Sequence, residues 1–335
     1  MKDERISLAH GDGGELAHRL IQDIFVAAFG HNDQARFDAA IFPAASQQMA
    51  ITTDSFVVNP LFFPGGNIGK LAVAGTVNDL AVSGVTPLYL TAAFMIEEGF
   101  KVQELKEIVN SMAAEAQKTN VRIIAGDTKV VERGSMDGLY INTTGVGFVN
   151  EKNLPRPEAI AEGDSIIISG TVGDHGVAIV SARGELGIKT EIDSDCASLN
   201  DLIRNVVENV DGVRIMRDPT RGGIATTLVE IAEDFGVTME IAEEEIPLRN
   251  EVKGVCEILG YDPLYLANEG KVLMIVNPSD EKRVLELLRE HELGKDAKVI
   301  GQVTGKEKGR LHLRTGLGST RRLNRLSGMM LPRIC

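Results

Sequence analysis

The chain contains 335 residues, which is long enough for two domains with separate hydrophobic cores. Its formal net charge of −13 disfavours nucleic acid as a principal partner, and its three cysteines form neither a disulfide framework nor a zinc-ligand spacing. The apolar runs are too short to cross a membrane and no apolar signal region follows Met1, so we expect a cytoplasmic protein with no membrane partner.

The first part of the chain alternates predicted helices and strands. A glycine-rich loop at residues 11–14 precedes an amphipathic helix over residues 15–29, and both belong to an N-terminal segment over residues 1–34. Strands are predicted at residues 48–58, 88–96, 122–131 and 140–149, and helices at residues 68–83 and 102–118. This alternation predicts an α/β domain over residues 35–150.

The second part of the chain follows a predicted linker at residues 151–163, which holds two prolines and several charges. Strands are predicted at residues 165–169, 237–241, 272–276 and 297–303, and helices at residues 177–183, 199–207, 223–235, 251–259 and 281–290. A second domain over residues 163–305 and a mixed α/β (α+β) fold are therefore predicted. Residues 306–335 show no sustained periodicity and are predicted to form a flexible tail.

Charge is distributed unevenly between the body and this tail. Eight basic residues and one glutamate give residues 306–335 a charge of +7, so the first 305 residues carry −20. Such a tail is typical of a solvated or RNA-binding segment. It is equally typical of a segment that docks onto its own acidic body or into a site that holds phosphates. The charge pattern alone does not separate these interpretations.

The last residue of the chain is a cysteine, Cys335. The end of a chain has its most mobile backbone, so burial of this thiol in a core is not expected. An exposed thiol is chemically reactive, so its presence at this position calls for an explanation. From position alone, a chance terminal residue and a thiol with a function are equally good interpretations.

Three aspartates lie within or at the end of apolar elements: Asp54, Asp79 and Asp127. A carboxylate in such surroundings is costly unless it is paired or bound to a metal. Three converging carboxylates suit Mg²⁺, which prefers oxygen ligands and usually binds together with phosphates. Each aspartate taken singly is more typical of a helix cap or a turn, although Asp79, deep in an apolar helix, fits that interpretation poorly.

Glycine-rich segments at residues 11–14, 64–70 and 218–223 each precede a predicted helix, where free backbone amides bind anions. None of them has a recognised nucleotide-binding spacing. His175, in a strand-to-helix turn, is more typical of a capping residue than of a catalyst. Lys129 and Glu269 lie beside glycines, and from the residues alone both are interpreted as surface charges.

Taken together, these segments resemble the HypE family of hydrogenase maturation proteins. The matching sequences lie at residues 9–14, 53–55, 63–72, 75–81, 125–130, 218–223 and 331–335. The aspartate segments are shared with the wider AIR synthetase (PurM-like) superfamily, whereas the Pro-Arg-Ile-Cys end is specific to HypE. The resemblance implies a two-domain AIR synthetase (PurM)-like fold, whose N-terminal domain forms a β-barrel-like homodimer and whose C-terminal α/β domain covers the site.

The resemblance also implies a reaction and its partners. HypF loads a carbamoyl group onto the terminal cysteine, and HypE uses ATP to dehydrate that group to a protein thiocyanate. The cyano group then passes through the HypC–HypD complex to the iron of a [NiFe]-hydrogenase. Cys335 would accordingly be the tether that carries the substrate.

Individual roles follow from the same resemblance. It implies that Asp54, Asp79 and Asp127 bind Mg²⁺ with ATP. Glu269 is expected to deprotonate the carbamoyl nitrogen as the catalytic base, assisted by Lys129. The residues expected to bind the nucleotide are Gly13, Gly14, Asn67, Lys70, Asn78, Asp127 and Thr128.

Three other functions compete with this interpretation. A small-molecule kinase or synthetase of the same superfamily would have no use for Cys335. A carrier that only moves a thiol-bound group between partners would have no use for Mg²⁺ and ATP. An RNA-binding protein is least favoured, because the body is acidic and no aromatic platform is present.

Overall fold

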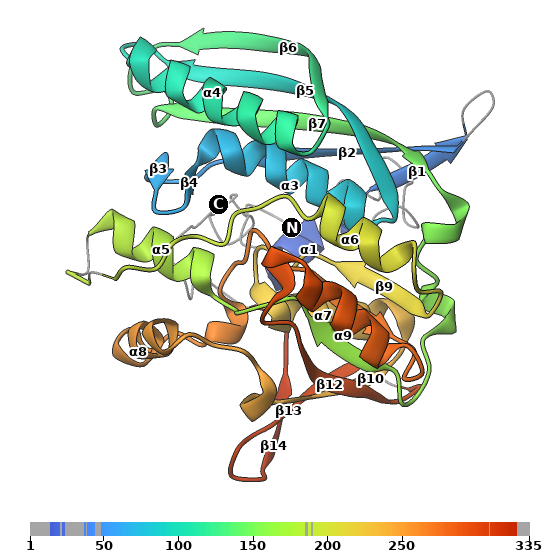
Figure 1. The fold of residues 1–335 in the computed structure, drawn as a ribbon. Coiled ribbons are helices and arrows are strands. Elements are labelled where there is room, and N and C mark those ends of the chain that lie inside the picture. Colours follow the sequence, from blue (N-terminus) through green and yellow to red (C-terminus); the bar gives the residue numbers. More distant parts are fainter. Residues whose placement is uncertain are drawn as a thin grey trace.

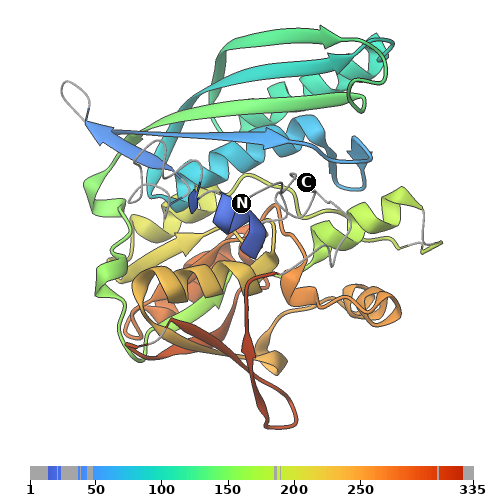
Figure 2. The ribbon, with the colours of Figure 1, turned by 180° about the vertical axis from the view of Figure 1, so that it is seen from behind.

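The structure is a computed structural model that describes residues 14–20, 22–23, 37, 39–43, 48–184, 187–188, 190–307 and 309–326. Gly13 and Cys335 lie outside these residues. The described chain forms two α/β domains, stacked one above the other in Figure 1 and seen from behind in Figure 2. The predicted two-domain α/β fold is therefore confirmed.

The first domain is built on a five-stranded sheet with the strand order β1-β2-β7-β5-β6. Its strands are β1 (Ala40–Pro43), β2 (Gln48–Phe56), β5 (Val85–Glu97), β6 (Arg122–Val131) and β7 (Leu139–Val149). Strands β5 and β6 run parallel and are connected through helix α4 (Val102–Lys118), whereas the other neighbours are antiparallel. A two-stranded hairpin, β3 (Phe62–Phe63) and β4 (Gly66–Asn67), leads into helix α3 (Ile68–Val82).

Helix α3 lies between the first sheet and the second domain (Figure 1). Apart from Lys70, Asn78 and Asp79, its sequence is largely apolar on every side, as expected for a helix that is buried nearly all round. Asn67 caps its start by accepting hydrogen bonds from the amides of Gly69 and Lys70, at 2.9 and 3.1 Å. Beyond its end, Gly84 has a φ of +75°, and a Cβ there would lie 2.2 Å from the carbonyl oxygen of Asn153. The helix is thus fixed at both ends.

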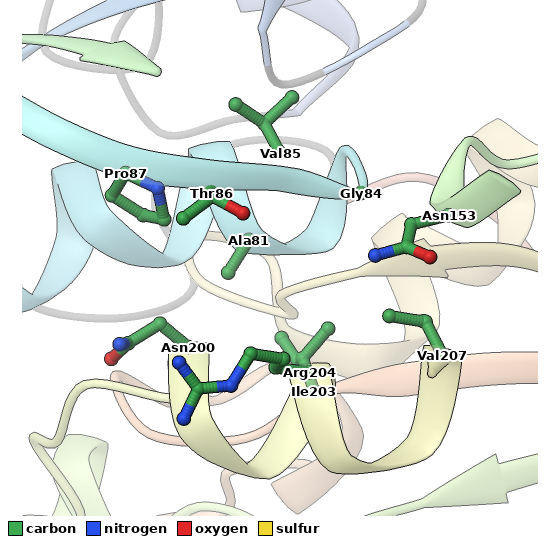
Figure 3. Close-up of a pocket in the computed structure, with 10 residues that line it drawn as sticks. All are labelled: Ala81, Gly84, Val85, Thr86, Pro87, Asn153, Asn200, Ile203, Arg204 and Val207. Carbon is green, nitrogen blue, oxygen red and sulfur yellow. The ribbon is translucent and has the colours of Figure 1, made fainter. Parts of the chain in front are cut away.

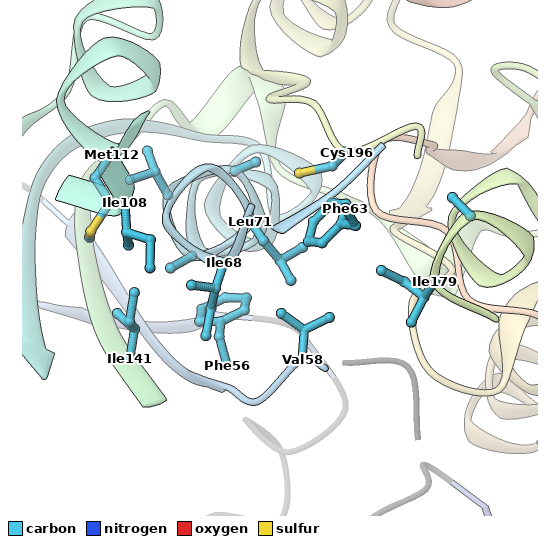
Figure 4. Packing of buried hydrophobic residues seen from close by; sticks show 14 of the residues in the cluster. Phe56, Val58, Phe63, Ile68, Leu71, Ile108, Met112, Ile141, Ile179 and Cys196 are labelled. Carbon is cyan, nitrogen blue, oxygen red and sulfur yellow. The ribbon is translucent and has the colours of Figure 1, made fainter. Parts of the chain in front are cut away.

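One face of the first sheet is packed and the other is open. Helices α3 and α4 cover the packed face, and together with the sheet they form the core drawn in Figure 4. Nearly all of β6 is exposed. Large apolar side chains are exposed along this sheet, on β2, β5, β6 and β7: Ile51, Tyr89, Met95, Ile123, Ile124, Val130 and Phe148. A surface of this kind is typical of an interface.

The second domain is built on a seven-stranded sheet with the order β14-β13-β10-β12-β8-β11-β9. These strands are β8 (Ser165–Ile168), β9 (Val213–Arg217), β10 (Thr238–Ala242), β11 (Leu273–Val276), β12 (Lys298–Gly305), β13 (Arg310–Arg314) and β14 (Thr320–Leu323). Helix α7 (Gly223–Phe235) packs on one face, and α6 (Asn200–Val207) and α9 (Glu281–Glu290) pack on the other. Helices α5 (Asp174–Arg183) and α8 (Asn250–Leu259) lie beside the sheet (Figure 1).

The flexible tail predicted from residue 306 onward is wrong for most of its length. Strand β13 pairs in parallel with β10, and β14 continues the sheet as its edge strand. Both strands are short and two glycines separate them, so apolar periodicity does not reveal this structure. At most residues 327–335 are left as a tail, and they lie outside the described part of the chain.

The basic residues of this region pair with acidic residues of the body. Arg314 approaches Glu240 at 3.3 Å, and Arg321 approaches Asp262 at 2.8 Å. Arg325 contacts Glu233 at 2.8 Å and its side chain is only 6% exposed. The charge pattern left several interpretations of this region open. For these three arginines, the structure confirms that they dock onto the chain's own acidic body.

We expect Arg325→Ala to release the end of the described chain. Its removal takes the cation from Glu233 of α7 and one of two neighbouring arginines from Glu230, and it should lower the free energy of unfolding by about 1–3 kcal/mol. Urea denaturation and protease cleavage near the C-terminus measure both effects. Arg322→Ala, at an exposed position of β14, is the matched control and should behave as the wild type; equal stability of both variants would contradict the anchoring role.

Candidate active site

Residues 193–199, between α5 and α6, are extended and form hydrogen bonds with both domains. They are called the interdomain segment below. On the side of the first domain, the amide of Ser194 donates to the carbonyl of Pro64 at 2.9 Å. The side chain of Asn78 bonds at both ends, donating to Ala197 O at 3.0 Å and accepting from Leu199 N at 2.7 Å. Asn78 was predicted to bind the nucleotide; the structure shows it fastening α3 to this segment.

Two further buried side chains support the interdomain segment. Ser198 donates its hydroxyl to Glu115 of α4 at 2.6 Å. His175 is fully buried in the first turn of α5, where its Nδ1 lies 2.8 Å from the hydroxyl of Ser194 and its ring meets Phe63 edge-on. The interpretation of His175 as a turn residue is therefore refined: it packs against the segment.

On the side of the second domain, the segment bonds to the loop before β11. The amide of Glu269 donates to Asp195 Oδ1 at 3.0 Å, and the amide of Ala197 donates to the carbonyl of Glu269 at 3.2 Å. Lys271 Nζ lies 3.1 Å from Asp195 Oδ2. A Cβ on Gly270 would lie 1.8 Å from the carbonyl oxygen of Asp195, so only glycine fits there.

Glu269 is buried, and its interpretation as a surface charge is wrong. Burial raises the pKa of its carboxyl well above the usual 4.5, and the negative charges of Asp195, Asp218 and Asp54 raise it further. The positive charge of Arg221 acts in the opposite direction. A carboxyl with a raised pKa exchanges a proton closer to neutral pH, as an acid–base catalyst requires.

Asp54 and Asp79 lie at the contact between β2 and α3. Asp54 Oδ2 is 4.0 Å from the position that a Cβ on Gly75 would take, and Thr52 donates its hydroxyl to Asp79 Oδ2 at 2.8 Å. Burial raises the pKa of Asp54, whereas the positive charge of Arg221 and the amide of Ser55 lower it. Arg221 thus acts on both Asp54 and Glu269, which places residues of the two domains around one site.

Asp127 and Lys129 lie on the exposed edge strand β6, where their charged atoms are 3.9 Å apart. Strand register places Asp54 beside Thr143 of β7, Thr143 beside Ala92 of β5, and Ala92 beside Gly126. Three strand spacings therefore separate Asp127 from Asp54, about 14 Å. Within one described chain the three aspartates do not converge, and no group of three or more potential metal ligands forms among the described residues.

The other predicted nucleotide-binding residues are distributed over several elements. Asn67 caps α3, which uses the amides that an anion would need there, and Lys70 donates to the carbonyl of Gly65 at 2.9 Å. Thr128 is exposed on β6. Gly14 packs on Leu326, where a Cβ would lie 1.9 Å from the carbonyl oxygen. The structure does not gather them into one pocket.

A small cavity of about 30 Å³ lies at another point of the domain junction, between the end of α3, the start of β5 and helix α6 (Figure 3). Asn153, Asn200 and Arg204 supply its polar lining. Its volume suits a single water molecule. It is too small to hold a nucleotide.

Two of the three cysteines are buried, Cys196 and Cys256. Figure 4 shows Cys196 beside Phe63 in the core. Burial raises the pKa of Cys196 well above its usual value and that of Cys256 to about 11. Because the thiolate is the reactive form, both thiols are poorly suited to carry a group at neutral pH.

Sequence reasoning missed Asp195, Asp218, Arg221 and Lys271 as individual site residues. Residues 218–223 were noted for their glycines, but no sequence feature indicated that the positive charge of Arg221 acts on the carboxyls of the site. Asp195 lies in an irregular segment without hydrophobic periodicity, so no pattern distinguishes it from a surface loop residue. Only the folded chain shows that it is bonded to Glu269.

The chain matches the family models "AIR synthase related protein, N-terminal domain" over residues 36–149 and "AIR synthase related protein, C-terminal domain" over residues 161–314. It is 49% identical to a protein named carbamoyl dehydratase HypE from Cupriavidus necator, across 100% of this chain and 96% of that one. A solved HypE–HypF complex is similar at a TM-score of 0.85 and 48% identity, covering 92% of this chain and 99% of that chain. A solved HypE in complex with ATP is similar at 0.83 and 41%, covering 99% and 100%.

Within the described ranges, no helix combines the length and the apolar character needed to span a membrane.

We expect Glu269→Gln to make the protein more stable at alkaline pH. The raised pKa means that the folded state holds this proton more tightly than the unfolded state, so its stabilising contribution is complete below pH 4.5 and is lost as the pH rises through the folded pKa. Glutamine keeps the neutral form at every pH. Urea denaturation at pH 5 and pH 8.5 should show a gain over the wild type that grows with pH; a gain independent of pH would contradict the assignment.

Proposed function

The chain belongs to the HypE family of AIR synthase related proteins, and we propose that it is an ATP-dependent carbamoyl dehydratase acting on its own Cys335. The observation that carries this proposal is the buried Glu269, whose backbone is bonded to Asp195 and whose pKa is raised by the charge of Asp54 in the other domain. Relatives named carbamoyl dehydratase HypE, about half identical to this chain, support it. So does a related HypE structure with ATP.

The proposed reaction converts a thiocarbamate into a thiocyanate. The carbamoyl oxygen attacks the γ-phosphorus of ATP, which releases ADP and turns a poor leaving group into a phosphate ester. The nitrogen then loses both of its protons. The C–O bond breaks as phosphate leaves, and the C≡N bond forms. The net change is loss of one water from the thiocarbamate, coupled to hydrolysis of ATP to ADP and phosphate.

Glu269 is the proposed base for the carbamoyl nitrogen. Its buried position excludes bulk water, and its raised pKa makes it a stronger base than an exposed glutamate. Arg221 supplies a positive charge on the same side of the site, suited to phosphate oxygens.

The aspartates fit a hard cation through their oxygen donors. Asp54 is half-buried with a raised pKa, so its charged form would be stabilised by a cation, and Asp79 lies on the same contact between β2 and α3. Bound Mg²⁺ would neutralise charge on the triphosphate. Asp127, Thr128 and Lys129 lie too far away in their own chain, and we propose that they reach the site of a second protomer.

A homodimer formed through the open face of the first sheet provides that arrangement. This face exposes four large apolar side chains, Ile51, Tyr89, Met95 and Phe148. The edge strand β6 beside it exposes three more, Ile123, Ile124 and Val130. Covering it would bury them and would carry the whole of β6 into the interface. A β-barrel-like dimer is the proposed form.

The tail is proposed to bring Cys335 into the site. Leu326, the last described residue, is held by the hydroxyl of Thr226 and by the amide of Glu15, at 3.3 and 3.0 Å. Thr226 lies one turn along α7 from Gly222, next to Arg221. Nine residues remain from there to Cys335, with a reach of about 30 Å. The two described cysteines have raised pKa values, which favours Cys335 as the carrier.

HypF as the carbamoyl donor is supported by the related complex of HypE with HypF. We further propose transfer of the cyano group through the HypC–HypD complex to the iron of a [NiFe]-hydrogenase, in the cytoplasm. A small-molecule kinase or synthetase, or a passive thiol carrier, would be the remaining alternatives. The experiment described next separates all three.

Intact mass of the carbamoylated protein should fall by one water after ATP and Mg²⁺ are added, with the change located at Cys335. Glu269→Gln should accept the carbamoyl group and slow the loss of water by about 100-fold or more, because the nitrogen loses its base. Cys256→Ala is the matched control and should react as the wild type. Full activity on a small substrate without Cys335 would favour the kinase, and an unchanged mass after addition of ATP would favour the passive carrier. Loss of water without ATP would contradict the mechanism.

We expect Val130→Glu to dissociate the homodimer. Val130 is 67% exposed on β6, and a charge there would be buried in the proposed interface. Val102→Glu is the matched control, since Val102 is also 67% exposed but lies at the start of α4. Analytical ultracentrifugation should find a monomer only for Val130→Glu; a dimer in both variants would contradict the proposed interface.

A further inference from the structure

Glu269 lies in a loop, so neither a helix nor a strand fixes its backbone. The loop runs from the single turn Pro263–Tyr265 to the start of β11 at Leu273. A group that takes a proton from a substrate must be held to within a fraction of an ångström. The contacts of this loop therefore decide whether Glu269 is placed well enough to act.

One residue contacts this loop at three successive positions. Asp195 accepts the amide of Glu269 through Oδ1 at 3.0 Å, and its carbonyl fills the space beside Gly270. Its Oδ2 lies 3.1 Å from the ammonium group of Lys271. The reciprocal bond from Ala197 N to the carbonyl of Glu269, at 3.2 Å, completes the attachment.

The side chains that make this attachment are shielded from water. Asp195 is 2% exposed at its side chain and Lys271 is 10% exposed. A buried ion pair is costly to form but strongly opposes separation of its partners. Asp195 is therefore held by Lys271, and it holds the backbone of Glu269 in turn.

Other charged groups also act on the carboxyl of Glu269 through their charge. They are Asp54 on β2 and Asp218 and Arg221 on the loop before α7. Asp195 alone of these four belongs to the interdomain segment, which is bonded to α3 through Asn78. A displacement of that segment would move Glu269 relative to the first domain and hence relative to Asp54.

We propose that Asp195 is the positioning residue for Glu269, holding the proposed catalytic base in register with the first domain, and that Lys271 holds Asp195 in place. The inference rests on the proposed function, because the role of Glu269 is part of it. Asp195 is not itself required to touch ATP or the carbamoyl group. Its contribution is to the rate of the chemical step, with no contribution to nucleotide affinity.

The test compares three variants in the full-length, carbamoylated protein. Asp195→Asn keeps an oxygen that accepts the amide of Glu269, whereas Asp195→Ala removes it. Asp193→Ala is the matched control, because Asp193 is an exposed residue of the same segment. Single-turnover loss of water at saturating ATP measures the chemical step, and the dissociation constant for ATP is measured separately.

The expected rate for Asp195→Ala is about 100-fold below the wild type, with ATP affinity changed less than about twofold. Asp195→Asn keeps the acceptor for the amide of Glu269 but loses the ion pair with Lys271, so its rate should lie between those of the alanine variant and the wild type. Asp193→Ala should match the wild type. If the alanine variant does not fold, Asp195→Ser replaces it, since the shorter hydroxyl does not reach the amide of Glu269. The same 100-fold loss is expected of it.

Two outcomes would overturn the inference: a rate for Asp195→Ala or Asp195→Ser equal to the wild type, or an asparagine variant as slow as the alanine variant with ATP binding intact. Failure of the proposed function is recognised separately, because the wild type itself would then show no ATP-dependent loss of water. With an active wild type, the variants decide the role of Asp195 alone.

Discussion

The interdomain segment, residues 193–199, bonds to both domains at once. Asn78 and Glu115 hold it on the side of α3 and α4, and the backbone of Glu269 holds it on the other side. Since the carboxyls of the site come from different domains, their relative position depends on this segment. Its polar groups are buried and hydrogen-bonded, so displacing it would leave several of them unsatisfied. The geometry of the site is therefore a property of the domain junction.

Burial and charge act together on the two central carboxyls. Glu269 and Asp54 are both destabilised in their ionised forms by loss of water, and Arg221 opposes this effect at each. Carboxyls in such a site bind a cation or a proton more readily than exposed carboxyls do. That combination fits a reaction in which a triphosphate must be neutralised and a nitrogen must be deprotonated in the same small volume.

Most of the regular elements could be predicted from the sequence, because apolar periodicity marks helices such as α4 and buried runs mark strands such as β11. The C-terminal strands β13 and β14 could not, since they are short and polar on one side. Asp54 and Asp79 were singled out by their apolar surroundings, and Glu269 received its role from a family resemblance, whereas Asp195 was missed. Its importance arises from a hydrogen bond to a residue 74 positions away in the sequence. The residues around Asp195 give no indication of such a contact. The separation of Asp127 from Asp54 likewise follows from strand order alone.

The proposed reaction requires that the carbamoyl oxygen leaves the tethered substrate as part of phosphate. It is tested most directly by loading Cys335 with a carbamoyl group that carries a heavy oxygen isotope, adding ATP in ordinary water and weighing the released phosphate. The account predicts one heavy oxygen in each phosphate formed. Heavy oxygen recovered in water, with none in phosphate, would contradict it.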